Sequence, residues 1–218
     1  MPPANYIEIN RTAYDSLAGE YRARREPDRQ KDFFLVRPFV RLLHQRFGAS
    51  HIRVLDVGCG NGLNLSMFVD EGMEVTGIDI SEKMLWVARE TCPTATLIHG
   101  DFLAHPFPPE SFHGVFAKAS IHLFPMSDAL RLLAKIHAAL VPEGVFYVTT
   151  TIDSSPAEGL RKKADYEGGI LRYRRTWSED ELSRAVVDVG FQILETGFNQ
   201  ESERGKKWFN IWAQKKVR

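Results

Sequence analysis

The segment Val54–Gly62, which reads VLDVGCGNG, constrains the fold of this chain more than any other part of the sequence. An apolar run that contains the acid Asp56 leads directly into closely spaced glycines, a pattern typical of a buried strand that turns sharply into a helix. Gly58 and Gly60 let the backbone pass close to a ligand, where a Cβ atom would collide with it. The sequence therefore predicts a ligand-binding turn at the end of a strand.

From about Ile52 onward, short β-branched runs alternate with longer helical patterns. This alternation predicts an α/β fold, in which helices cover both faces of a doubly wound, mostly parallel, Rossmann-like sheet. Ser178 and Glu181 have the spacing of a capping box at the start of a late helix, and Gly190 follows its end. The expected strands read, in chain order, IRVLDV, EVTGIDI, TATLIHGD, GVFAKAS, VFYVTTT, FQILETGF and WFNIWAQK.

A chain of 218 residues is long enough for one sizeable core and short for two ordinary domains. We therefore expect a single domain over residues 1–218. Within it, residues 1–50 have helical periodicity and are expected to form a cover over a Rossmann-like core of residues 51–218. Glycines and clustered charges interrupt any period over residues 153–177, which are expected to form a substrate-side insertion of loop with short helical or strand pieces.

Composition excludes several classes of protein. Lys plus Arg (28) equals Asp plus Glu (28), so the net charge supplies no long-range attraction for polyphosphate and argues against nucleic acid as the partner. No apolar stretch is long enough to cross a bilayer, which predicts a cytoplasmic protein without a membrane partner. Cys59 and Cys92 lie far apart and lack accompanying Cys or His ligands, so we expect free thiols and no metal site.

Two further acids are expected at the ends of neighbouring strands. Asp79 follows the glycine turn by about 20 residues, the position from which an acid accepts hydrogen bonds from ribose hydroxyls. Asp101 lies beside Phe102, a pairing that suits an exocyclic amine and a flat base. A nicotinamide-binding turn would have a third glycine where this chain has Leu63, so the pattern disfavours a dehydrogenase and a pyrophosphate ligand.

Five motifs, in their order and spacing, resemble the class I S-adenosylmethionine-dependent methyltransferases: VLDVGCGNG, GIDIS, GDF, PFPPESFHGV and LVPEGVFYVTT. The resemblance is specific from about Val54 to Thr151 and looser elsewhere. It implies a seven-stranded sheet of order 3-2-1-4-5-7-6 with the seventh strand antiparallel. It also implies in-line transfer of a methyl group from S-adenosylmethionine to an oxygen or nitrogen of a small-molecule metabolite, which leaves S-adenosylhomocysteine and requires no metal.

The same resemblance assigns residues to the cofactor. The opening AYDSLAGEY resembles the helix that precedes this domain in the family and closes over the cofactor. Lys118 has a second interpretation, as the polar residue at which an apolar strand ends. The residues expected to bind the cofactor are Tyr21, Arg25, Asp56, Gly58, Gly60, Asn61, Asp79, Ile80, Met84, Asp101, Phe102, Lys118 and Ser120.

The acceptor side carries fewer signals. His122 follows the fourth strand and is the candidate general base, since an ordinary histidine pKa of about 6.5 suits removal of a proton from a phenol or ammonium group; a merely structural role at the strand end is the alternative. The run ILRYRRTW suggests an anionic or aromatic substrate, or else an edge strand with solvated arginines. The expected substrate-side residues are Tyr14, Arg172, Tyr173, Arg175 and Trp177.

Two other functions stay open on the sequence. One is a catalytically inactive regulatory module that binds S-adenosylmethionine. The other is a tRNA-modifying methyltransferase, because the N-terminal helix and the arginine run resemble those of some RNA-modifying relatives. The sequence leaves the acceptor unidentified and allows a monomer or a homodimer.

Overall fold

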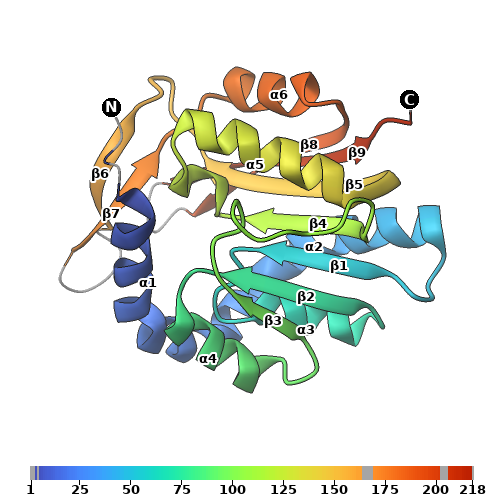
Figure 1. The fold of residues 1–218 in the computed structure, drawn as a ribbon, viewed down its shortest axis with the longest axis horizontal. Coiled ribbons are helices and arrows are strands. Elements are labelled where there is room, and N and C mark those ends of the chain that lie inside the picture. The colour runs from blue at the N-terminus through green and yellow to red at the C-terminus, as the bar shows by residue number, and fades with distance from the viewer. Residues whose placement is uncertain (1–2, 4, 164–168, 202–205, 218) are drawn as a thin grey trace.

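A seven-stranded sheet forms the centre of the molecule (Figure 1). The computed structural model describes residues 3, 5–163, 169–201 and 206–217. The sheet has the order β3-β2-β1-β4-β5-β9-β8, and β9 runs antiparallel to both of its neighbours. Its strands are β1 (Arg53–Val57), β2 (Glu74–Asp79), β3 (Thr96–His99), β4 (Phe112–Lys118), β5 (Leu140–Thr151), β8 (Phe191–Glu201) and β9 (Lys206–Lys215).

This arrangement confirms the predicted Rossmann-like class. Strands β6 (Glu158–Lys163) and β7 (Ile170–Arg175) pair only with each other among the described strands, in a separate two-stranded sheet. With these two set aside, β8 and β9 are the sixth and seventh strands of the main sheet. Its order is therefore 3-2-1-4-5-7-6 with an antiparallel seventh strand, as expected.

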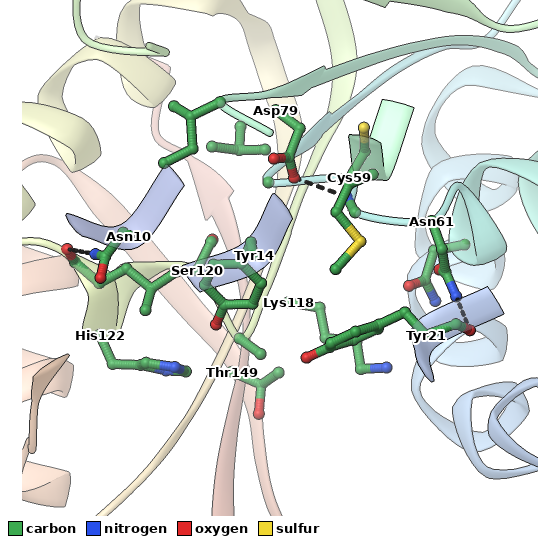
Figure 2. A pocket seen from close by; sticks show the side chains of 18 of the residues that line it. Asn10, Tyr14, Tyr21, Cys59, Asn61, Asp79, Lys118, Ser120, His122 and Thr149 are labelled. Atoms are coloured by element: carbon green, nitrogen blue, oxygen red, sulfur yellow. Dashed lines mark hydrogen bonds between the residues drawn. The ribbon is translucent and has the colours of Figure 1, made fainter. Parts of the chain in front are cut away.

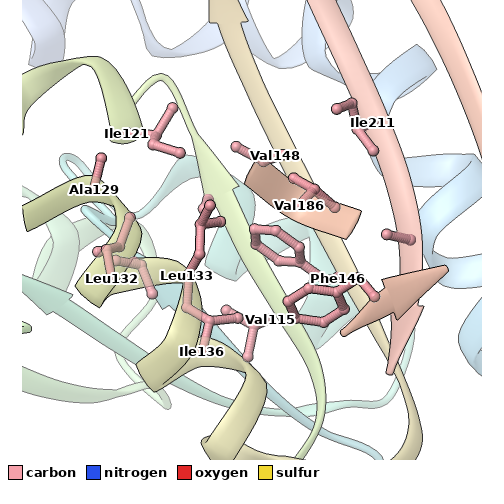
Figure 3. Close-up of a cluster of buried hydrophobic side chains, with 14 of the residues drawn as sticks. Val115, Ile121, Ala129, Leu132, Leu133, Ile136, Phe146, Val148, Val186 and Ile211 are labelled. Atoms are coloured by element: carbon pink, nitrogen blue, oxygen red, sulfur yellow. The ribbon is translucent and has the colours of Figure 1, made fainter. Parts of the chain in front are cut away.

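Helices cover both faces of the sheet, which explains why its central strands are apolar on both sides. Helices α5 (Met126–Ala139) and α6 (Glu179–Asp188) cover one face, and α2 (Arg25–Phe47) and α3 (Leu63–Asp70) the other (Figure 1). Figure 3 shows the first of these cores, where residues of α5 and α6 meet the sheet. Among its labelled residues are Val115, Leu132, Leu133, Ile136, Phe146, Val148, Val186 and Ile211.

Alternation along the strands divides their side chains between the two cores. On β5, Phe146 and Val148 belong to the core under α5 and α6, whereas Val145 and Tyr147 belong to the core under α2 and α3. The Tyr147 ring stacks on Phe116 of β4 at a centroid distance of 4.4 Å. Full burial of such a side chain contributes about 1.5–3 kcal/mol to the free energy of unfolding. Because each face of the sheet has its own buried residues, the helices on each face stabilise it separately.

Helix α1 (Tyr6–Ala23) lies across the carboxyl ends of the parallel strands, beside the arrowheads of β1, β2 and β4 in Figure 1. Its Leu17 and Ala18 pack against Met84 and Val87 of helix α4 (Glu82–Thr91). Of the expected helical cover of residues 1–50, α1 closes the edge of the sheet where the glycine turn and Asp79 lie, whereas α2 packs on a face of the sheet.

The segment from 153 to 177 is more regular than the sequence indicates. Its described part contains β6 and β7, whose pairing extends from Glu158 opposite Arg175 to Lys163 opposite Ile170. Ser178 then caps α6 by accepting a hydrogen bond of 3.1 Å from the Glu181 N–H, as predicted. None of the helices in the described ranges combines the length and apolar character needed to cross a bilayer.

Candidate functional site

The glycine turn after β1 adopts left-handed backbone conformations that favour glycine. The φ angles of Gly58, Gly60 and Gly62 are 74°, 53° and 76°. A Cβ on Gly58 would lie 3.0 Å from the Cβ of Ser120, and one on Gly62 would lie 2.9 Å from the Cα of Ala88. A Cβ on Gly60 would meet no protein atom within 4 Å. Gly58 and Gly62 thus allow close protein packing, and Gly60 borders open space.

Asp79 at the end of β2 holds this turn in place. Its Oδ2 accepts a hydrogen bond of 2.9 Å from the Gly60 N–H, and its Oδ1 accepts one of 2.8 Å from the Ser81 N–H. Burial raises the pKa of the Asp79 carboxyl above its ordinary value, while the two N–H donors oppose that rise. A single acid therefore joins the ends of β1 and β2 at the edge of the sheet.

A pocket of about 570 Å³ opens at this edge, under α1 (Figure 2). Its volume lies in the range of about 300–1,000 Å³ usual for small-molecule sites. Figure 2 shows side chains from α1, the glycine turn, β2, β4 and β5 around it. Fourteen residues predicted from the sequence line it together: Tyr14, Tyr21, Gly58, Gly60, Asn61, Asp79, Ile80, Met84, Asp101, Phe102, Lys118, Ser120, His122 and Arg172.

Asp56, expected to bind the cofactor, does not line the pocket. Strand side chains alternate, so Val57 reaches the pocket wall and Asp56 faces away from it. Burial raises the pKa of the Asp56 carboxyl to about 8, and nearby Lys118 limits the rise. Asp56 is therefore outside the lining residues although Lys118, Asp79 and Asp32 around it line the pocket, and its contact with the cofactor stays a prediction. Arg25 begins α2, but its side chain lies outside the described part of the chain.

The arginine-rich run is divided by the same alternation, which corrects three expected substrate-side residues. Arg172 lines the pocket, whereas Tyr173, Arg175 and Trp177 do not. Tyr173 is buried against Tyr6, with their ring centroids 5.4 Å apart. Arg175 forms ion pairs with Glu158, at 3.2 Å, and with Glu181, and its guanidinium lies 4.8 Å from the centre of the buried Trp177 ring. These three side chains fix the β6–β7 sheet to the core.

Lys118 is more than a polar end of β4, because its ammonium forms an ion pair with Asp32 of α2. The same Asp32 oxygen accepts a hydrogen bond of 3.2 Å from the Asn64 side chain on α3. Asp32 is buried, and both it and Lys118 line the pocket. A charged pair from α2 and β4 therefore forms part of the pocket wall.

His122 lies on a short 3-10 turn, η1 (Ile121–Leu123), that follows β4. Its Nδ1 is 3.1 Å from the Thr150 hydroxyl oxygen, and its ring centroid is 6.4 Å from that of Trp208. The ring is buried from bulk solvent but reaches the pocket wall. His122 is therefore oriented by a neighbouring strand, as a catalytic histidine needs to be.

Sequence reasoning missed several lining residues. Asn10 could have been found, because Tyr6, Asn10 and Tyr14 recur every four residues and share one face of α1. Arg174 could have been found by its alternation with Arg172. Other lining residues, including Asp32, Thr149, Asn199, Gln200 and Trp208, come from elements distant in sequence and carry no local signal.

The described part of this site contains no cluster of metal ligands. Over the described ranges, His, Cys, Asp and Glu side chains form no group of three that could hold a metal ion. The two cysteines, Cys59 and Cys92, are buried free thiols.

Comparison with known proteins gives consistent results. Residues 54–144 match a family described as a methyltransferase domain. An uncharacterized methyltransferase, C70.08c, of Schizosaccharomyces pombe is 40% identical over an alignment of 165 residues, gaps included, that covers 66% of this chain and 61% of that protein. The demethylmenaquinone methyltransferase of Chlorobaculum tepidum is 34% identical over 102 residues, 46% of this chain and 41% of that protein. The chain therefore spans less than two thirds of the length of either relative.

A solved structure shares the fold over nearly the whole chain. It is that of the 1,6-didemethyltoxoflavin-N1-methyltransferase of Burkholderia thailandensis, with bound 1,6-didemethyltoxoflavin and S-adenosylhomocysteine. The TM-score is 0.75 at 22% identity, covering 99% of this chain and 91% of the other. At this identity the likeness concerns the fold alone.

Proposed function

We propose that this chain, which belongs to the class I S-adenosylmethionine-dependent methyltransferase family, binds that cofactor under α1 and methylates an oxygen or nitrogen atom of a small molecule. One observation carries the proposal. A single pocket joins the glycine turn, Asp79 and the Asp101–Phe102 pair to His122. Groups suited to a nucleoside thus share a cavity with a group suited to proton transfer.

The residues present fit this cofactor. The Ser120 hydroxyl lines the pocket, is buried, and has no hydrogen-bond partner among the described residues, so it is available to a ligand. Gly60 borders open space, which lets a ligand approach its backbone. Both positions adjoin the end of β1, where the family places the methionine part of the cofactor.

Specific residues would hold each part of the cofactor. Asp79 would accept hydrogen bonds from the ribose hydroxyls, since each of its oxygens can accept more than the one N–H that it holds here. Phe102 and Ile80 would contact the adenine, and Asp101 would accept from its amine. Helix α1 would exclude water from above, because Tyr14 and Tyr21 line the same pocket.

When bound, the cofactor supplies a methyl group activated by the positive sulfur. The protein then has to align the acceptor and to exclude water. His122 takes a proton only from an acceptor whose nucleophile is protonated at working pH, such as a phenol or an ammonium group. The Thr150 hydroxyl orients the imidazole for that role.

Calorimetric titration with S-adenosylmethionine, S-adenosylhomocysteine and NAD tests the cofactor assignment. We expect the first two to bind with micromolar affinity and NAD not to bind. Purified protein is then incubated with S-adenosylmethionine labelled in the methyl group, with a small-molecule extract in one sample and tRNA in another. Label in the small-molecule fraction supports the proposal. Label in tRNA, or tight cofactor binding without transfer to either pool, supports one of the two alternatives instead.

A further inference from the structure

We propose that the acceptor is a flat ring compound with a carbonyl oxygen on the ring, and that the Asn199 side chain of β8 donates a hydrogen bond to this oxygen. The inference deepens the proposed function and rests on it, because it names the substrate class of the same site. Its basis is a chain of hydrogen bonds that joins the buried core to the pocket through Tyr147, Asn210 and Asn199. Burial of polar groups costs free energy unless they are hydrogen-bonded, so the buried links of this chain have fixed directions.

Asn210 of β9 sets the direction of the chain. This residue is buried, and its Nδ2 donates a hydrogen bond of 3.1 Å to the Gly197 carbonyl and one of 2.8 Å to the Asn199 Oδ1. A carbonyl can only accept, so an Asn210 amide turned over would place its own oxygen against the oxygen of Gly197. Its Oδ1 accepts a hydrogen bond of 2.8 Å from the hydroxyl of Tyr147, which is buried on β5. Both polar atoms of the Asn210 side chain are therefore satisfied in one orientation.

Asn199 carries this direction to the pocket, which it lines. Because its Oδ1 faces Asn210, its Nδ2 is the other end of the amide, and no described residue accepts a hydrogen bond from that nitrogen. An amide nitrogen is a donor only. The pocket wall therefore presents an oriented, neutral donor, and the group that it binds is an acceptor such as a carbonyl oxygen.

Trp208 of β9 gives this donor a flat neighbour. The strand register places Asn199 of β8 and Thr151 of β5 on either side of Trp208, and all three line the pocket. The Trp208 ring centroid is 6.4 Å from that of His122, which Thr150 of β5 holds. Neighbouring strands lie about 4.8 Å apart, so β8 and β5 are separated by about 10 Å, a distance that suits one or two fused rings. A flat ring stacked on Trp208 would have Asn199 at one edge and His122 toward the other.

This part of the pocket is distinct from the part expected to hold the ribose. Figure 2 shows His122 and Thr149 across the pocket from Asp79. Net charge does not select the acceptor here, because acidic and basic side chains both line the pocket, among them Asp28, Asp32, Arg172 and Arg174. The neutral donor and the aromatic ring are therefore the groups from which we infer the acceptor class.

The test compares flat probes with and without a ring carbonyl. Three pairs are titrated calorimetrically, with and without saturating S-adenosylhomocysteine: 2-pyridone and pyridine, 4-quinolone and quinoline, and isatin and indole. For at least one pair we expect the carbonyl compound to bind at least about threefold more tightly, as one neutral hydrogen bond predicts. Equal or weaker binding of the carbonyl compound in every pair, or no binding of any carbonyl compound, would overturn the proposal.

Variants then show which groups are responsible. Asn199→Asp keeps the shape of the side chain and replaces the donor by an oxygen, so the ratio of carbonyl to parent binding should fall to one or below. Asn210→Leu lets the Asn199 amide turn over, so the ratio should fall partway. Gln192→Ala is the matched control, since Gln192 is an exposed amide of β8 that does not line the pocket.

Thermal unfolding establishes that each variant is folded. A carbonyl preference that persists in folded Asn199→Asp contradicts the proposal. A preference unchanged in folded Asn210→Leu contradicts the positioning role of Asn210.

Stacking on Trp208 is tested with benzamide and cyclohexanecarboxamide, which share the amide and differ in whether the ring is flat. Wild-type protein should bind benzamide at least about threefold more tightly, and Trp208→Leu should bring the ratio toward one. Trp86→Leu is the control, because Trp86 is exposed on α4 and does not line the pocket. Equal binding of the two amides by the wild type would contradict the flat acceptor.

The two proposals fail separately. The probe preferences measured without S-adenosylhomocysteine decide the acceptor class. Failure of S-adenosylhomocysteine itself to bind would instead contradict the proposed function.

Discussion

Asp15 of α1 accepts a hydrogen bond of 2.7 Å from the hydroxyl of Ser81, the residue that caps α4. The same carboxylate oxygen accepts a weaker bond, of 3.3 Å, from the Lys83 N–H. A negative charge at the start of a helix is stabilising, because the first N–H groups lack partners within the helix. The cover over the pocket is thus fastened to the helix that begins directly after Asp79.

We predict that Asp15→Ala lowers the free energy of unfolding by about 1–2 kcal/mol, the usual effect of a lost helix cap. Urea unfolding followed by circular dichroism measures the change. Glu8→Ala is the matched control, since Glu8 also pairs with Arg11 but is exposed. Its effect should stay within about 0.5 kcal/mol. Equal losses in both variants would mean that the bond to Ser81 contributes nothing.

Asp79→Ala should weaken binding of S-adenosylhomocysteine by about 1–3 kcal/mol through loss of the ribose hydrogen bonds. The measurement is calorimetric, with thermal unfolding to establish that the variant is folded, because Asp79 also holds the Gly60 and Ser81 backbone. Asp188→Ala, at an exposed acid near the end of α6, should bind like the wild type. Unchanged affinity in folded Asp79→Ala would show that the cofactor lies elsewhere.

Two glycine substitutions should change stability in opposite directions. Gly62→Ala combines a positive φ with a Cβ that would approach the Cα and Cβ of Ala88 to 2.9 Å, so it should destabilise by about 2–4 kcal/mol. Gly19→Ala, at an exposed position in α1 with open space around it, should stabilise by about 0.5–1 kcal/mol. Urea unfolding compares the two, and a destabilised Gly19→Ala would contradict the helix assigned there.

The pH dependence of stability should report on Asp56. Its pKa of about 8 in the folded protein exceeds the value of about 3.9 expected in the unfolded chain. The folded state therefore keeps a proton that the unfolded state has released, and this group's contribution to stability falls as pH rises toward 8. Asp56→Asn cannot titrate, so its free energy of unfolding should rise relative to wild type between pH 5 and pH 8. A constant difference across that range would show that Asp56 is ionised in the folded protein.

Local patterns predicted the sheet, and they predicted that the glycine turn, Asp79 and Asp101 lie together, for a physical reason. The acid and glycine signals lie at the ends of strands, and parallel strands bring those ends to one edge. Gly58, Asp79 and Asp101 therefore converge on one pocket even though they are distant in sequence. The alternation of apolar runs with helical patterns predicts the parallel strands that bring these residues together.

The residues expected on the acceptor side were harder to predict, because strand pairing and helix packing decide which side chains reach the pocket. Composition assigned Tyr173, Arg175 and Trp177 to the substrate side, but all three are buried. Alternation along β7 turns Tyr173 and Arg175 toward the core. Asp32 and Trp208 reach the pocket only because α2 and β9 pack where they do. No periodicity in the local sequence predicts such long-range contacts.

The bonds that fasten α1 also bear on how the chain matures. Tyr6 binds Asp128 across 122 residues of sequence, Tyr14 binds Arg172 across 158, and Asn10 binds Tyr173 across 163. On the ribosome, α1 is made long before β7, so its bonds to Arg172 and Tyr173 can form only after β7 has emerged. Until then Leu17 and Ala18 lack Ile170 of β7, which packs against their cluster in the folded protein. Closure of the pocket is thus a late event in the synthesis of this protein.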